Sequence, residues 1–144
     1  MSTVDYPAGG TPAVRHVMTP KVLGIVPSAP LEVALRMMVE AGVRHLPVID
    51  GSRCLGLLHE SDVLWRLWST PGSARPAAGA LARSPVLAVE ESDDVRTVAR
   101  RMTEARSDAA VVHCRGSVVG IVTATDLLAL LAGPDSRAPR PHSV

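Results

Sequence analysis

The side chains best suited to hold a small polar ligand are a threonine and an aspartate three residues apart, Thr123 and Asp126 in the run GIVTATD. A carboxylate can accept hydrogen bonds from both hydroxyls of a diol such as ribose, and each such bond contributes about 1.5–3 kcal/mol. If a helix begins near Thr125, its first N–H groups also favour an anion. Threonine and aspartate are equally common helix caps. Ligand binding and capping both stay open, and one pair can do both.

A related run, GLLHESD, keeps the aspartate as Asp62 but has His59 where the threonine would be. Imidazole titrates near neutral pH, so His59 either offers a positive charge to a phosphate or fills the space and prevents binding. Two more basic residues, Arg44 and His45, lie upstream. The guanidinium fork matches phosphate geometry, although solvated residues at the start of a strand are the simpler interpretation.

Metal binding and nucleophilic catalysis find little support. Four residues have suitable ligand atoms (Cys54, His59, His113 and Cys114), but they form no CxxC or HxxxH pair. Neighbouring residues of a strand point to opposite faces, which separates His113 from Cys114. No oriented base or oxyanion pocket is evident for a Cys–His pair. We therefore expect no metal, no required cofactor and no enzymatic activity.

Composition excludes several partner classes. The formal net charge is +1, from 15 Lys and Arg against 14 Asp and Glu, and the aromatic residues are Tyr6, Trp65 and Trp68. Such a chain lacks the positive field and the stacking surfaces of nucleic-acid binders, and it lacks the charge to coat an anionic membrane. The sequence has no apolar run long enough for a membrane span and no leader with an apolar centre. We expect a cytoplasmic protein without disulfides.

The chain contains an internal repeat. Residues 17–68 laid on 81–132 without a gap give 12 identical positions, where chance in this composition gives roughly four or five. Identical pairs include Ser28 with Ser92, Gly56 with Gly120, and Asp62 with Asp126. The chain is therefore interpreted as a duplication.

Each copy is predicted to form a strand, a helix, two strands and a second helix. The first strands are VLGIV (22–26) and VLAV (86–89), and the following helices begin after Ser28 and Ser92, which are placed to cap them. The first helix ends at Gly42, which suits a left-handed cap, whereas its counterpart Arg106 does not. Hairpins with turns longer than two residues follow, and helices at about 61–68 and 125–132 close the copies.

We assign an N-terminal tail to residues 1–14, the first copy to 15–68, a linker to 69–80, the second copy to 81–132 and a C-terminal tail to 133–144. The linker and the tail after residue 132 are rich in Pro, Gly, Ser and Ala, which disfavour helices and strands alike. A single copy of about fifty residues is marginal alone, so the two copies are expected to stack and bury each other's sheets.

Residues 15–68, and with fewer matches 81–132, resemble consecutive cystathionine-β-synthase-type (CBS) domains. The resemblance rests on Met18-Thr19-Pro20, on Arg44-His45-Leu46-Pro47-Val48, and on GIVTATD. It implies an α/β fold in which two strand-helix-strand-strand-helix units pack sheet to sheet with pseudo-two-fold symmetry. It also implies two clefts between the units and, in many members, a homodimer.

The resemblance implies a regulatory protein that binds AMP, ADP, ATP or S-adenosylmethionine between the copies and signals to a separate effector protein. In the second copy, Asp126 would bind the ribose hydroxyls and Thr123 a phosphate or ribose oxygen, while Val86 and Ala110 would line the adenine slot. A triphosphate would be repelled there by Asp108, which replaces Arg44, so AMP or a neutral or cationic adenosine compound fits better. The remaining candidate binding residues belong to the first copy: Thr19, Val22, Arg44, His45, His59 and Asp62.

Trp65 and Trp68 are three apart on the predicted closing helix and share one face. They belong either to the core or to a dimer contact, because tryptophan is enriched at the centres of interfaces. The alternative to ligand sensing is therefore a module that dimerises or docks to a protein without a small ligand.

Overall fold

The computed structural model describes residues 11–20 and 22–133. Within them the chain forms two compact units that do not follow chain order. Unit 1 combines the residues up to Val22 with those from Leu87 onward, and unit 2 comprises Leu23–Val86. Each unit is thus completed by a segment that the sequence assigns to the other copy.

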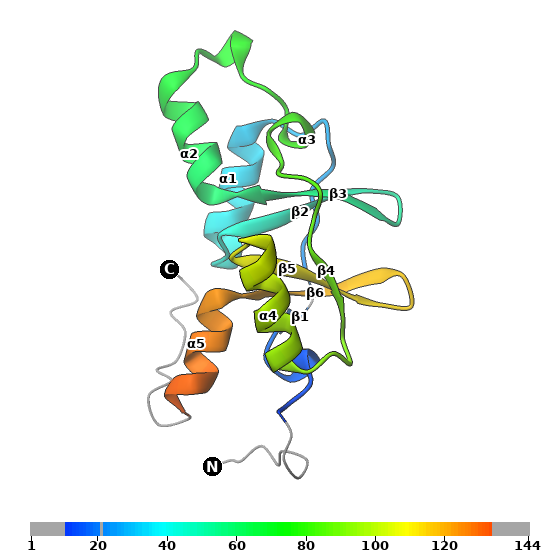
Figure 1. The fold of residues 1–144 in the computed structure, drawn as a ribbon. Helices are drawn as coiled ribbons and strands as arrows, with labels where there is room; N and C mark the ends of the chain where they lie inside the picture. Colours follow the sequence, from blue (N-terminus) through cyan, green and yellow to red (C-terminus); the bar gives the residue numbers. More distant parts are fainter. Residues whose placement is uncertain (1–10, 21, 134–144) are drawn as a thin grey trace. The chain divides into compact units, whose positions relative to one another are not determined.

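Unit 2 contains a two-stranded antiparallel sheet and three helices (Figure 1). Strand β2 pairs with β3, and Ile25 adds an isolated parallel bridge to Val48. The sequence predicted a strand at 22–26, and this single bridge is all that forms. In chain order the elements are α1 (Leu31–Ala41), β2 (His45–Asp50), β3 (Arg53–His59), α2 (Glu60–Ser69), a 3-10 turn (Gly72–Ala74) and α3 (Ala78–Leu81).

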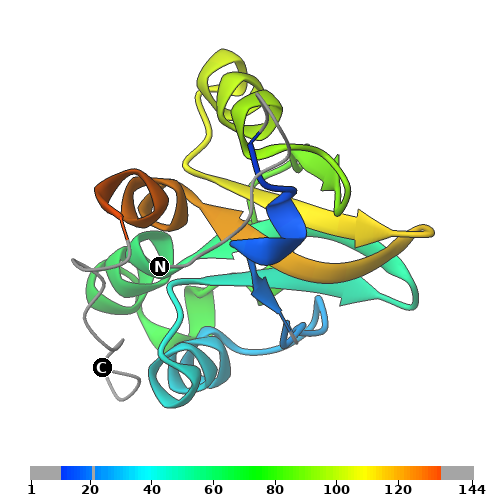
Figure 2. The same cartoon turned by 90° about the horizontal axis from the view of Figure 1, so that it is seen from below.

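Unit 1 contains a four-stranded sheet in the order β1-β6-β5-β4. The N-terminal strand β1 lies antiparallel beside β6, as Figure 2 shows for the blue segment next to the orange strand. Its elements are a 3-10 turn (Val14–His16), β1 (Thr19–Pro20), β4 (Ala88–Glu90), α4 (Val95–Ala105), β5 (Ala109–Cys114), β6 (Ser117–Thr123) and α5 (Ala124–Ala132).

The two units repeat the same succession of elements at an offset of 64 residues. Helix α1 corresponds to α4, the hairpin β2–β3 corresponds to β5–β6, and the closing helices begin at Glu60 and Ala124. The predicted α/β class, the duplication and the order of helices and strands are confirmed.

The exchange of N-terminal segments is also symmetric. In unit 1, Thr19 pairs with Ile121, and in unit 2 the equivalent Arg83 pairs with Leu57. The backbone N–H of Leu57 donates to Arg83 at 3.0 Å, and the N–H of Arg83 donates back at 2.9 Å. Each segment therefore adds an edge to the hairpin of its unit.

Two glycines allow this close approach. A Cβ on Gly56 would lie 3.0 Å from the carbonyl oxygen of Arg83, and a Cβ on Gly120 would lie 2.9 Å from that of Thr19. Real Cβ atoms rarely approach a backbone oxygen so closely. The close approach of the added strand edge thus explains why both copies have a glycine at this position.

The first helices of the two units end alike. Gly42 has φ 69° and ψ 33°, as predicted, and Arg106 has φ 53° and ψ 42°. The prediction that Arg106 would not form a left-handed cap is therefore wrong. The N–H of Ser107 donates to the carbonyl of Met102. This backbone bond satisfies a carbonyl at the end of the helix whatever the residue type, and it holds Arg106 in the left-handed conformation.

The predicted N-caps and turns need correction. The helices start after Pro30 and Asp94 rather than at Ser28 and Ser92, and the Asp94 carboxylate accepts from the N–H of Thr97. The hairpin turns have two residues, since Asp50 pairs with Arg53 and Cys114 pairs with Ser117. Positive φ values at Gly51, Arg115 and Gly116 match such tight turns.

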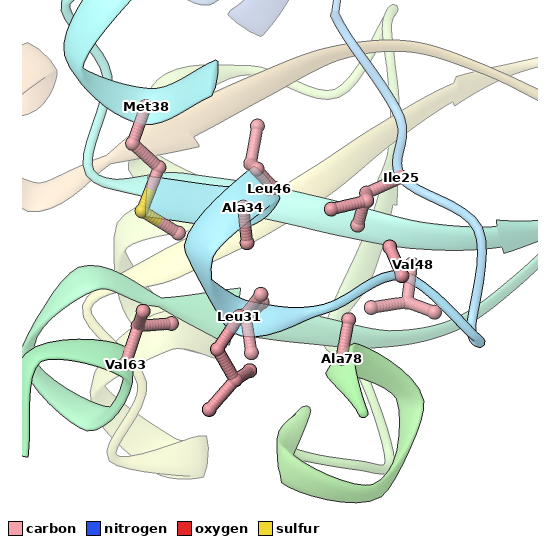
Figure 3. Packing of buried hydrophobic residues seen from close by; sticks show 10 residues of the cluster. Ile25, Leu31, Ala34, Met38, Leu46, Val48, Val63 and Ala78 are labelled. Atoms are coloured by element: carbon pink, nitrogen blue, oxygen red, sulfur yellow. The ribbon is translucent and has the colours of Figure 1, made fainter. Parts of the chain in front are cut away.

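Each unit has its own apolar core. In unit 2, α1 and α2 contribute Leu31, Met38 and Val63, which pack with residues of the hairpin (Figure 3). Ala78 of α3 belongs to the same cluster. In unit 1 the cluster joins α4 to the sheet, and its buried members are Val14, Val89, Val98, Met102, Ala110, Val112 and Val122.

Parts of the expected linker and N-terminal tail are structured. Ala78 is fully buried, and its N–H donates to the carbonyl of Ala29 at 2.9 Å, so burial and backbone bonding overcome the composition of residues 72–81. Val14 is fully buried as well, and its N–H donates to Asp93. The remaining tail predictions, for 1–10 and 134–144, lie outside the described residues.

Candidate functional site

In unit 1, Thr123 and Asp126 form a capping box at the start of α5. The carboxylate oxygen Oδ2 of Asp126 accepts from the N–H of Thr123 at 2.9 Å and from its hydroxyl at 3.1 Å. The N–H of Asp126 donates to the Thr123 hydroxyl oxygen at 3.2 Å. Capping is therefore present, and the Asp126 side chain is only 3 % exposed. Ligand binding by this pair stays a prediction.

Three other predicted residues share unit 1 with this pair. Thr19 lies on β1 beside Ile121 of β6, two residues before Thr123, and it is half-buried. Val22 ends the same exchanged segment and is also half-buried. Ala110 belongs to the core cluster. The structure thus joins Thr19 and Val22, predicted for the first copy, to the unit of Thr123 and Asp126.

In unit 2, the equivalent aspartate is bound by an arginine. Arg83 donates through Nε to Oδ2 of Asp62 at 2.8 Å and through a terminal nitrogen to Oδ1 at 3.2 Å. This two-bond fork lowers the pKa of Asp62, and a smaller contribution comes from the positive charge of His59. The carboxylate of Asp62 is therefore held in its charged form.

Arg83 is the residue that the motifs missed. It lies outside GLLHESD, 21 positions after Asp62, and the exchange of segments brings it back to the same unit. A signal was present in the repeat, because Arg83 is the counterpart of Thr19, itself a predicted binding residue. Recognising it required the knowledge that residues 78–86 complete the first hairpin.

His45 and His59 face each other across β2 and β3. They are directly paired in the register, and their ring centroids lie 4.7 Å apart in an edge-to-face arrangement. His59 is 7 % exposed and His45 is half-buried. The expectation that the chain holds no metal stays a prediction.

The remaining two predicted residues also lie in unit 2. Arg44 is largely exposed, and its Nε lies 3.9 Å from a carboxylate oxygen of Glu60, which agrees with a solvated residue at a strand entry. Val86 is half-buried and ends the part of the chain assigned to unit 2. The structure therefore groups Val86 with Asp62 and Arg83, and places Thr123 and Asp126 in the other unit.

Apolar side chains project from both closing helices. Trp65 is 64 % exposed and Trp68 is 85 % exposed on α2, and Leu128 and Leu131 are exposed on α5. The two tryptophans therefore do not belong to the core of their unit, which was one of the two interpretations from the sequence. Among the described residues, no helix is both long and apolar enough to cross a bilayer.

Comparison with solved structures supports the fold. The CBS domain pair of protein MJ0100, solved with 5′-methylthioadenosine and S-adenosyl-L-methionine, superposes with a TM-score of 0.76 at 20 % identity, over 85 % of this chain and 98 % of that one. An uncharacterised conserved protein from Pyrococcus horikoshii gives 0.74 at 27 % identity, over 89 % and 98 %. CBSX2 in complex with AMP gives 0.67 at 27 % identity, over 84 % and 96 %.

Sequence comparison gives the same answer. An uncharacterised 33.4 kDa protein in the ribosomal RNA operon of Thermofilum pendens is 31 % identical over 129 residues, which are 82 % of this chain and 43 % of that protein. The chain thus spans less than half of this curated relative. The family model for the CBS domain matches the sequence twice, at residues 14–69 and at residues 78–133. The chain belongs to the CBS domain family and carries two copies of the domain.

Proposed function

We propose that this chain is a regulatory module that binds an adenine nucleotide or a related adenosyl compound between its two CBS copies. In this proposal the bound ligand favours one arrangement of the two copies, which a separate effector protein recognises. A cytoplasmic location and the absence of catalysis belong to the same proposal. Turnover of ATP by the purified chain would contradict it.

The observation that carries the proposal is the aspartate at the start of each closing helix. Asp126 and Asp62 occupy equivalent places after β6 and β3, where a helix N-terminus favours an anion. A carboxylate there can accept both hydroxyls of a ribose. Support also comes from the solved relatives with AMP or with S-adenosyl-L-methionine and 5′-methylthioadenosine.

Thermal unfolding with added ligand tests this function. A ligand that binds only the folded protein raises the melting temperature, by an amount set by its concentration relative to Kd. We expect AMP, ADP, ATP or S-adenosylmethionine to raise it, and GMP at the same concentration to do so less. An unchanged melting temperature with all four adenine compounds would contradict the proposal.

A second candidate is a ligand-independent dimerisation module, favoured by the exposed Trp65 and Trp68. Exposed large apolar side chains that share one helix face often mark a surface that contacts another protein, and tryptophan is enriched at the centres of such interfaces. In this case light scattering shows a homodimer without ligand, and Trp68→Ala converts it to a monomer. Leu55→Ala, which removes a less exposed apolar side chain from β3, is the matched control and leaves the mass unchanged.

A further inference from the structure

The two equivalent aspartates have different partners. Asp126 is bound by the neutral donors of Thr123, within its own capping box. Asp62 is bound by the cationic fork of Arg83, and His59 replaces the capping threonine and offers no side-chain cap. In unit 2 the carboxylate is thus bonded by a cation, whereas the capping bonds of Asp126 come from neutral donors.

Arg83 is held at this place by the backbone rather than by the ion pair alone. Its N–H and C=O form a two-bond bridge with Leu57, and Gly56 leaves room for its carbonyl. Its equivalent in unit 1, Thr19, is held in the same way beside Ile121. The same backbone position on the strand edge is thus present in both units, and the side chain it bears differs.

The surroundings of Asp62 add further positive charge. The charge of His59 acts on Asp62, and so does that of Arg66 on α2. Arg44 lies exposed at the neighbouring strand entry, next to the half-buried His45. Glu60 lies 3.9 Å from Arg44. The charges of His59 and Arg66 therefore add to that of Arg83 near Asp62.

We propose that Arg83 determines which adenosine compounds unit 2 accepts. This inference rests on the proposed function. A ribose that takes the carboxylate of Asp62 breaks the two bonds of the Arg83 fork, and a ligand phosphate gives the guanidinium a replacement partner of matching geometry. Adenosine offers the guanidinium no such replacement, so the loss of the ion pair between Asp62 and Arg83 opposes the binding of adenosine. Unit 2 therefore selects phosphorylated adenosines.

The test compares AMP with adenosine, which differ only in the phosphate. Calorimetric titrations use the full chain with Asp126→Ala, so that only the unit 2 site is observed. We expect AMP to bind at least about ten-fold more tightly than adenosine, as the loss of a charge-assisted bond implies. Adding Arg83→Met should weaken AMP by about ten-fold and leave adenosine equal or tighter, so that the preference disappears.

Two further variants complete the test. Arg75→Met removes another arginine–carboxylate pair of unit 2, that with Glu32 at 2.7 Å, without touching Asp62, and should leave the preference unchanged. Asp62→Ala should weaken the binding of both compounds by roughly ten- to hundred-fold. An AMP preference that survives Arg83→Met, or AMP binding that is as tight after Asp62→Ala as before it, overturns the inference. If the unaltered chain binds neither AMP nor the other adenine compounds, the proposed function itself fails, which is a different result.

Discussion

At the scale of residues, the Thr123–Asp126 pair has a structural role that is separable from any ligand. Both side chains bond to the backbone at the first turn of α5. Thr123→Val removes the hydroxyl at nearly constant shape and should lower the free energy of unfolding by about 1 kcal/mol in urea denaturation. Thr123→Ser keeps the oxygen and should recover most of that loss. Equal stabilities for the two variants would contradict the capping role.

The pKa of Asp62 is lowered by the bonds from Arg83, so its ion pair stabilises the folded state only while the carboxylate is charged. That stability is present above the ordinary carboxylate pKa of 3.8 and disappears as the pH falls through the lower folded-state value. Arg83→Met should raise the pKa of Asp62, measured by NMR titration, and lower stability at neutral pH by about 1 kcal/mol or less. No change in the Asp62 titration would show that the ion pair does not form in solution.

The sequence predicted the pairing of Thr123 with Asp126 and the carboxylate of Asp62, but not the partner of Asp62. Asp62 and Asp126 were found because they fall on equivalent positions of the repeat and within short runs of recognisable spacing. Arg83 could not be found in this way, because its approach to Asp62 depends on a strand edge formed across 26 residues. Composition and periodicity contain no information about such an approach.

At the scale of elements, the two caps provide a matched pair. Gly42 and Arg106 have the same left-handed conformation, which costs a residue with a Cβ roughly 1–2 kcal/mol. Glycine loses more backbone entropy on folding, which offsets part of that gain. Arg106→Gly should therefore raise the free energy of unfolding by about 0.5–1 kcal/mol, and Gly42→Ala should lower it by about 1 kcal/mol. Denaturant titrations measure both, and a destabilising Arg106→Gly would argue against this cap.

Element types and order followed from the sequence, whereas details at their ends did not. The apolar spacing that predicted the helix before Gly42 is realised in Leu31, Ala34 and Met38, all of which are buried. The end of the second helix was mispredicted because residue type was given more weight than the bond from Ser107 to Met102, which is formed by backbone atoms of any sequence. The turns were overestimated for the same reason, since Arg115 adopts a positive φ unusual for its type.

At the scale of the whole molecule, each unit is completed by a segment that the sequence assigns to the other copy. Val14 lies before the first copy in the sequence, yet it is fully buried in unit 1. Val14→Ala should lower the free energy of unfolding by about 2 kcal/mol, from lost burial and the cavity left behind. Hydrogen exchange followed by mass spectrometry should show the loss of protection in peptides from residues 87–133. A loss concentrated in residues 31–69 would contradict the assignment of Val14 to unit 1.

Such an exchange is hard to predict because the repeat suggests contiguous domains. The duplication, the α/β class and the family were all accessible from residues 15–132, since they depend on local pattern and spacing. The partner of Thr19 is Ile121, about a hundred residues away, and neither residue type indicates that the two pair. The candidate binding residues stay predictions, and the sequence distributed them between the copies by position in the chain rather than by the units of the structure.

The central claim is that the aspartate at the start of each closing helix holds an adenosine ligand. Isothermal titration calorimetry of AMP into the full chain tests it most directly, with Asp126→Ala and Asp62→Ala as single and double variants. We predict measurable heat for the unaltered chain, a roughly ten- to hundred-fold weaker affinity at each altered site, and this weakening at both sites in the double variant. Unaltered heat of AMP binding in the folded double variant would contradict the account.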